Sequence, residues 1–299
     1  MKKKYILAFI ISLLSLPIWS IQSFIKDGDY YVDGKKLDIN NILNLYEGNI
    51  TKTLLIDSKT QKLYLVIEPL QGEELNWHNT GILKIHQYDE DSSLFFKNYS
   101  ETRVSNFVKS IGFTIKDMYN GKLLLDCCDR RISPWKYYEI IIDIKSNKET
   151  ICKIPSGDSS VIGFNNDNIF FDDKYYSLKN EKFIKYKYVL DYPRLDYSKQ
   201  NLVGFLNGYV FIYEIETEKL ITTGICPKRL DKYYYYSFSN NCFMNEDYLI
   251  IPEDISPGYC SYSRVKSTDA NYDLYIYDRK TFKKIKKMKT QTTKAIIYK

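Results

Sequence analysis

Two stretches of the sequence repeat an arginine and an aspartate at the same spacing, with a proline before them and a tyrosine after them. The first, YPRLDY, contains Arg194 and Asp196, and the second, CPKRLDKYYYY, contains Arg229 and Asp231. A guanidinium group binds a carboxylate or phosphate through two parallel hydrogen bonds. The two arginines, with Arg103 in ETRVSNF as a third copy, are therefore candidates for an anion-binding ring. In the alternative interpretation, each arginine pairs with an aspartate and holds neighbouring repeats together.

Two further segments place a tryptophan beside polar side chains. LNWHNTG holds Trp77 and His78, which can either stack on a sugar or aromatic ligand or close a loop. LDCCDRRISPW holds Arg131 and Trp135 after two adjacent cysteines. These cysteines either form a strained vicinal disulfide beneath a ligand site or remain separate thiols beside a hairpin loop. The candidate ligand-binding residues are Arg194, Arg229, Arg103, Trp77, His78, Arg131 and Trp135.

The sequence provides little material for catalysis or for a metal centre. It has two histidines, and it lacks a nucleophile elbow, a P-loop, a dinucleotide fingerprint and any C-x-x-C pair. DGDYYVDGKK lacks the ligand order of an EF-hand. His86 lies in the strand-like ILKIHQY and is expected to be a sheet residue. We therefore predict no catalytic residue, no metal and no cofactor.

The elements that must position these residues are strands joined by a repeated polar hairpin. Each copy begins with an apolar residue, usually followed by an acid, and crosses a few polar residues before the next strand. Short polar side chains bond their own backbone at such turns. A second turn signal, Asn followed by Gly or near an acid, recurs at Asn120, Asn166, Asn207 and Asn245. The second residues of the hairpin copies, expected at equivalent corners on the rim, are Asp57, Asp89, Asp143, Ser177, Glu214 and Asp278.

Together the two signals define a strand-rich unit of about 35 to 50 residues, a period typical of propeller blades. The segment YIYDRKTFKKI, Tyr275 to Ile285, resembles the outer hairpin of bacterial β-propellers, including WD-repeat-like and quinoprotein-like ones. The GH and WD dipeptides of true WD repeats are missing. The period and the resemblance together predict an all-β fold, a single propeller of four-stranded blades, and the length of the mature chain divided by the period gives about six of them (five to seven). In propellers, ligands usually bind where the links between blades cross near the axis. The alternative folds are a β-sandwich or two stacked β-domains.

The N-terminus predicts export. Three lysines precede an apolar run from Tyr5 to Trp19, which is too short to span a bilayer of about 30 Å. We therefore predict a signal peptide over residues 1–20 and a propeller domain over residues 21–299. An uncleaved membrane anchor is the alternative. No second apolar run approaches the length of a spanning helix, so we expect an extracytoplasmic protein, periplasmic or secreted, without a transmembrane span in its mature chain.

These observations predict an exported, non-catalytic propeller that binds or scaffolds a protein or glycan ligand. The formal net charge of +6 includes the three N-terminal lysines, and what remains is too mild to favour nucleic acid as a partner. One alternative is a carbohydrate-active enzyme, because a glycosidase needs only two carboxylates at a suitable separation. The other is a purely structural envelope protein, since a fold does not decide a function.

Overall fold

The structure is a computed structural model that describes most of the chain between Phe24 and Ala295. Residues 1–23, where the signal peptide is predicted, lie outside the described residues. The described ranges are 24–26, 29–32, 35–48, 50–60, 62–71, 78–89, 91–92, 94–97, 100–154, 160–226, 243–244, 247–255, 272–290 and 294–295. Among the described helices, none is long and apolar enough to cross a membrane.

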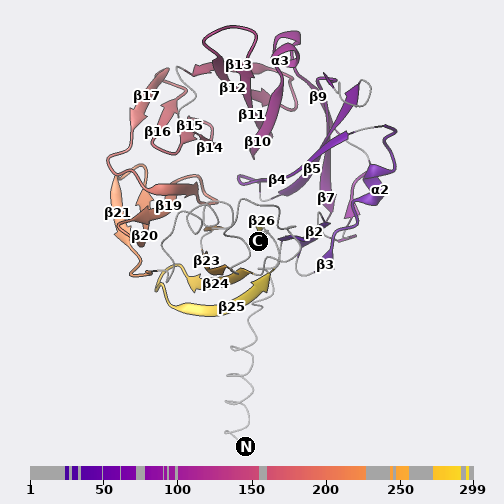
Figure 1. Ribbon diagram of the computed structural model, residues 1–299. Helices are drawn as coiled ribbons and strands as arrows, with labels where there is room; N and C mark the ends of the chain where they lie inside the picture. The colour runs from indigo at the N-terminus through magenta and orange to yellow at the C-terminus, as the bar shows by residue number, and fades with distance from the viewer. Residues whose placement is uncertain are drawn as a thin grey trace, which may run out of the picture.

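Three antiparallel sheets of four strands follow the chain order from the inside of a ring to its outside (Figure 1). One contains β14 (Val161–Phe164), β15 (Asn168–Phe171), β16 (Lys174–Ser177) and β17 (Lys182–Lys185). The next contains β18 (Asp191–Leu195), β19 (Asn201–Leu206), β20 (Tyr209–Glu214) and β21 (Lys219–Thr222). Another contains β22 (Phe243–Met244), β23 (Tyr248–Ile255), β24 (Tyr272–Asp278) and β25 (Lys284–Thr290).

Two further blades are joined at their inner strands by a single parallel pair, Asp57 with Met118. One has β10 (Phe113–Tyr119), β11 (Lys122–Asp129), β12 (Lys136–Asp143) and β13 (Glu149–Ile154). The other has an outermost strand split into two short pieces, both paired with its third strand. Its strands are β4 (Ile50–Asp57), β5 (Lys62–Gln71), β6 (His78–Asn79), β7 (Ile82–Asp89), β8 (Leu94–Phe95) and β9 (Ser100–Arg103). The short helices are α2 (Asn40–Leu43) and α3 (Asn106–Ile111).

The two ends of the described chain meet in one sheet, ordered β26 (Lys294–Ala295), β1 (Phe24–Lys26), β2 (Asp29–Val32) and β3 (Lys35–Lys36). In this sheet β26 occupies the inner position and pairs antiparallel with β1. The sheets are thus arranged around a common centre and closed by the C-terminal strand, as Figure 1 shows. The chain is therefore a β-propeller, and the sandwich alternative does not hold.

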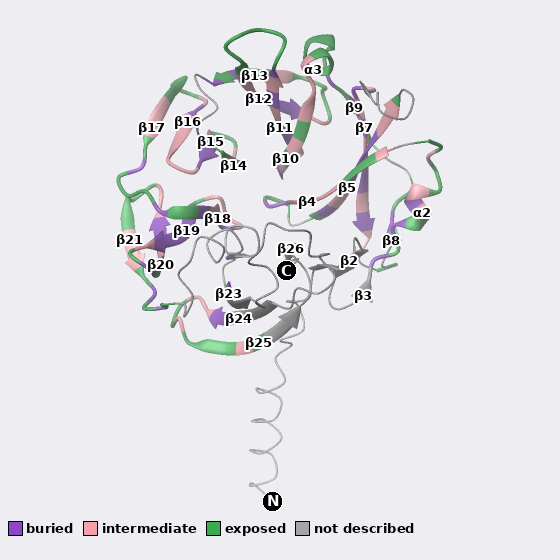
Figure 2. Ribbon diagram, viewed as in Figure 1, coloured by how far each residue is buried: buried purple, intermediate pink, exposed green. Residues whose placement is uncertain are grey.

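Apolar clusters fill the spaces between adjacent blades, because the middle strands are buried on both faces. In β11, Leu123 and Leu125 pack toward the β4–β9 blade, whereas Leu124 between them packs toward the β14–β17 blade. All three are fully buried. Figure 2 shows buried residues on the middle strands and exposed ones on outer strands and turns. Because both faces of these strands are buried, their sequences are continuous apolar runs and do not alternate strictly between apolar and polar residues.

Alternating strand directions give each blade two distinct ends. The turns from the first strand to the second and from the third strand to the fourth lie at one end of each blade. We name this end the turn face, and it includes residues 120–121 and 143–148. Second-to-third loops and the links to the next blade lie at the other end. We name it the link face, and it includes residues 130–135 and 186–190.

The predicted hairpin corners are confirmed for five of the six copies. Asp89, Asp143, Ser177, Glu214 and Asp278 each end the third strand of a blade, before its fourth.

The prediction for Asp57 is wrong, because this residue ends a first strand. Its carboxylate accepts hydrogen bonds from its own turn and from the backbone N–H groups of Asn120 and Gly121 in the next blade, at 2.8 and 2.7 Å. Asp57 therefore joins two blades instead of marking a rim corner.

Candidate functional site

Carboxylates near the inner strands hold neighbouring blades together. Asp117, on β10, accepts hydrogen bonds from the backbone N–H of Phe164, on β14, at 3.1 Å, and from the ammonium group of Lys199, in the β18–β19 turn, at 2.8 Å. The Lys199 and Asp117 side chains are 11% and 14% exposed. This ion pair therefore connects three consecutive blades.

Asp196 has a similar role further along the chain. Its carboxylate accepts hydrogen bonds from the backbone N–H groups of Gln200 and Asn201, both at 3.0 Å, and lies 3.5 Å from the guanidinium of Arg279. Arg279 follows the third strand of the next blade. The acid that follows Arg194 in the repeated motif thus forms its ion pair with Arg279, from a segment that the motif does not include.

A pocket of about 580 Å³ opens on the link face between the β14–β17 and β18–β21 blades. Its walls are the start of β14, Asp172 and Asp173 in the second-to-third turn, and the segment that links β17 to β18. Arg194, on the inner strand β18, lines this pocket and is partly buried. The volume lies within the range of about 300 to 1,000 Å³ that is usual for small-ligand pockets. We take this link-face pocket as the candidate site.

A glycine and a tyrosine in an unusual conformation shape this pocket. A Cβ atom at Gly204, on β19, would lie 2.8 Å from Leu190 Cβ and 3.0 Å from the carbonyl oxygen of Asp191. Only glycine therefore lets the link approach β19 so closely. Tyr192 has a φ of +52°, which is rare for a bulky residue and stores strain. Tyr192 and Val189 are 40% and 53% exposed, so the link presents apolar surface at the pocket.

The polar lining of the pocket is predominantly acidic. Asp172, Asp173 and Asp191 face a single arginine, Arg194. Burial raises the pKa of the Asp172 carboxyl, and its buried Oδ1 has no hydrogen-bond partner among the described residues. The pocket therefore suits a ligand that presents hydrogen-bond donors or positive charge. An anion held by arginines alone, as the repeated motif suggested, fits this lining less well.

The predicted pair Arg131 and Trp135 lies in the second-to-third loop between β11 and β12. Arg131 donates two hydrogen bonds to the carboxylate of Asp129, at 2.8 and 3.0 Å, and a third to Ser110 on α3 at 3.0 Å. These bonds lower the pKa of Asp129. The Arg131 fork is thus occupied within the chain, whereas Trp135 is 54% exposed and lies under the guanidinium of Arg130.

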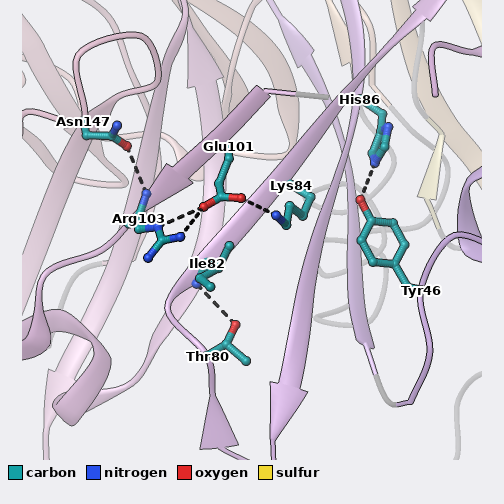
Figure 3. A network of polar contacts seen from close by, with 8 residues as sticks. All are labelled: Tyr46, Thr80, Ile82, Lys84, His86, Glu101, Arg103 and Asn147. Carbon is teal, nitrogen blue, oxygen red and sulfur yellow. Dashed lines mark hydrogen bonds and ion pairs between the residues drawn. The ribbon is translucent and has the colours of Figure 1, made fainter. Parts of the chain in front are cut away.

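Arg103 does not share the position of Arg194. It ends β9 in the outermost strand of its blade, whereas Arg194 lies on an inner strand. Figure 3 shows Arg103 bound to Glu101, which also binds Lys84, while its backbone N–H donates to Asn147 at 3.0 Å. The interpretation of Arg103 as a third copy in a central ring is therefore wrong. A fourth strand and a first strand cannot be told apart from a short motif.

The remaining predicted residues fall largely outside the described structure. Arg229 and Trp77 lie outside the described residues, and the same holds for the side chain of His78, whose backbone begins β6. His86 is a buried residue of β7, as predicted. Its Nδ1–H donates to the carbonyl oxygen of Phe96 at 2.9 Å, so Nε2 accepts from the Tyr46 hydroxyl at 2.7 Å (Figure 3). Burial lowers the pKa of His86.

Comparisons with known proteins find a similar arrangement in several solved structures, at low similarity. A dihydro-heme d1 dehydrogenase, NirN, in complex with DHE has 12% identity and a TM-score of 0.38 over 91% of this chain and 54% of that chain. The tricorn protease has 10% identity and a TM-score of 0.36 over 84% of this chain and 26% of its own. The extracellular domain of a putative one component system from B. thetaiotaomicron has 12% identity and a TM-score of 0.33 over 80% of this chain and 33% of that chain.

This chain thus spans about half the length of the first of these proteins and less of the other two. No protein-family profile and no curated protein matches the sequence. The propeller assignment rests on the sheets themselves.

The adjacent cysteines are free thiols on a regular strand. Cys127 pairs with Tyr138 and Cys128 with Tyr137 in an unbroken β11–β12 register, so consecutive side chains point to opposite faces. The vicinal disulfide considered from the sequence is therefore not formed, and the separate-thiol interpretation holds.

The acids of the link-face pocket are the functional candidates that the sequence did not single out. Asp172 and Asp173 stand in FFDDKYYS, directly after a buried strand. An adjacent acid pair at a strand end is a usable signal. Their proximity to Arg194, which belongs to the next blade, comes only from the way the blades pack.

Proposed function

We propose that this chain is an exported, non-catalytic propeller that binds a protein or glycan ligand on its link face, at the pocket beside Arg194. The pocket itself is the observation that carries this proposal. Its apolar rim, Val189 and Tyr192, lies beside acidic groups, including an oxygen of Asp172 that has no hydrogen-bond partner within the described part of the chain. Exposed tyrosine rings with a few polar groups are typical of interaction sites.

The engagement of the inner acids argues against carbohydrate hydrolysis by carboxylates near the axis. A glycosidase needs two carboxylates that both reach the scissile bond. Asp57, Asp117 and Asp196 are instead bound to backbone N–H groups and cations that join blades. Their roles in holding the ring together account for their presence near the axis.

The test uses Tyr192→Gly, because this change separates binding from stability. Glycine adopts a positive φ without strain, so the variant should melt at the same temperature as the natural protein or higher. It also removes the exposed ring, so capture of ligands from a glycan array and in pull-downs from the native host should fall. The control is Tyr209→Ser, which removes a tyrosine that is 47% exposed on β20.

The two arms of the test distinguish glycan from protein ligands. Array binding that is lost only in Tyr192→Gly supports a glycan, and a specific pulled-down protein lost only in that variant supports a protein. Equal capture by Tyr192→Gly and Tyr209→Ser would contradict the proposed site. Export is tested by N-terminal sequencing, which should start near Ile21 or Phe24. Recovery of intact Met1 in membranes would contradict cleavage.

A further inference from the structure

A second pocket, of about 700 Å³, lies on the turn face between the β4–β9 and β10–β13 blades. Its floor is apolar, formed by Met118 and Ile85, which are 1% and 4% exposed. Tyr64 and Ile144 are partly buried and line it as well. This volume is again within the range of about 300 to 1,000 Å³ for ligand pockets. It is separate from the link-face pocket, at the opposite end of the blades.

The charged residues that line this pocket are both lysines. Lys97 comes from the segment between β8 and β9, and Lys145 from the β12–β13 turn of the neighbouring blade. Both are exposed, and neither is paired with a carboxylate in the described part of the chain. None of the lining residues is acidic. The lining thus has the opposite charge to that of the link-face pocket.

The segments that carry these lysines are held in place by backbone contacts. The N–H of Ile144 donates to the carbonyl oxygen of Gly121 at 3.1 Å. Two residues further on, the backbone N–H of Ser146 donates to the Asp143 carboxylate at 2.8 Å. Lys145 therefore lies between two residues whose backbones are held by hydrogen bonds.

The Phe96 segment is fixed in the same manner on the other blade. The Phe96 N–H donates to the carbonyl oxygen of Gln87 at 2.9 Å, and its own carbonyl oxygen accepts from His86. The Phe96 ring is 47% exposed and lines the pocket next to Lys97. The ring and the adjacent cation are therefore presented together by an anchored backbone.

We propose that this turn-face pocket binds a small amphipathic anion, a carboxylate or sulfonate carried on an apolar body. The apolar body lies on Met118 and Ile85 beside the Phe96 ring. The anionic group lies between the ammonium groups of Lys97 and Lys145. Two cations on separate blades attract one anionic group, and the buried floor supplies hydrophobic contact. This inference is independent of the function proposed for the link face.

The experiment measures decanoate binding to the full chain by titration calorimetry, with decan-1-ol as the uncharged counterpart. The Lys97→Glu/Lys145→Glu variant should bind decanoate at least tenfold more weakly than the natural protein. Lys179→Glu/Lys182→Glu is the matched control, because it makes the same charge change at two exposed lysines of the β16–β17 hairpin. It should bind decanoate within twofold of the natural protein.

A second variant tests the cavity rather than its charge. Ser100 is exposed at the start of β9 and lines the pocket, so Ser100→Trp should fill the mouth without overpacking the core and abolish decanoate binding. The proposal is overturned if the natural protein shows no saturable binding of decanoate. It is also overturned if decan-1-ol binds as tightly as decanoate, or if both lysine double variants bind equally.

Discussion

Replacing Lys199 by methionine should destabilise the protein by about 3 kcal/mol, because it breaks an ion pair whose two side chains are largely buried. The substitution keeps an aliphatic side chain of similar length and removes the ammonium group that lies 2.8 Å from Asp117 Oδ2. Removing one partner of a buried pair typically costs about 3 to 5 kcal/mol. We take the lower end, because the Asp117 carboxylate keeps hydrogen bonds from the N–H groups of Phe164 and Met118.

The measurement is urea unfolding, with thermal melts in parallel. A loss of about 3 kcal/mol corresponds to roughly 6 °C or more in melting temperature for a domain of this size. Lys116→Met provides the control from a neighbouring ion pair. Its partner Asp126 is 3.0 Å away, and the two side chains are 36% and 33% exposed. Removing an exposed pair of this kind should cost less than about 1 kcal/mol.

A double variant tests whether the unpaired charge is the cause. Lys199→Met/Asp117→Asn should be more stable than Lys199→Met alone, since a neutral amide needs no counter-charge and its oxygen still accepts from one of the two backbone N–H groups that bind the carboxylate. Equal small losses in Lys199→Met and Lys116→Met would refute the reasoning. So would a double variant that is less stable than Lys199→Met.

Further predictions concern the core and the pocket wall. Gly204→Ala should destabilise by roughly 1 to 3 kcal/mol in urea unfolding, because its Cβ would meet Leu190 at 2.8 Å; an unchanged midpoint would contradict this. Burial raises the pKa of Glu139 to about 9 from its ordinary 4.5, so the contribution of this group to the free energy of unfolding is fully present below pH 4.5 and is lost as pH rises toward 9. The Glu139→Gln variant should lose less stability over this pH range and should have a larger free energy of unfolding than the natural protein at pH 8. An unaltered dependence of stability on pH would contradict this prediction. Cys127 and Cys152 are buried, and burial raises the pKa of Cys152 to about 11. Both should react with a thiol reagent only on unfolding, and rapid labelling of the folded protein would disprove this.

The strand-rich repeat and the propeller class were predictable because they depend on local signals. A polar turn between two apolar runs gives a hairpin in any context, and five of the six copies end a third strand. Asp57 has the same local sequence pattern but ends a first strand. Asn207 lies in the turn between the second and third strands of its blade, whereas Asn120 lies in the turn between the first and second strands. The place of a turn within its blade depends on pairing between strands, which a short motif does not encode.

The candidate site was less predictable, because its walls come from two blades. The repeated motif correctly drew attention to Arg194, which lines the link-face pocket. It gave no indication that Asp172 lies across from it, or that Asp196 is held by Arg279. Arg103 has the same residue type in a similar phrase and nevertheless lies on the outermost strand. Charged residues acquire their neighbours from blade packing, so sequence spacing alone cannot identify their partners.

The pairing of β26 with β1 has a consequence for the order in which the protein folds. Most blades consist of strands that are consecutive in the chain, so each can form from local contacts soon after its hairpins do. The pairs Phe24 with Ala295 and Ile25 with Lys294 join segments from opposite ends of the described chain. Closing so long a loop is entropically slow relative to forming a hairpin. Ring closure is therefore the late step of folding, and until it occurs the edge of β1 stays open to pairing with another chain.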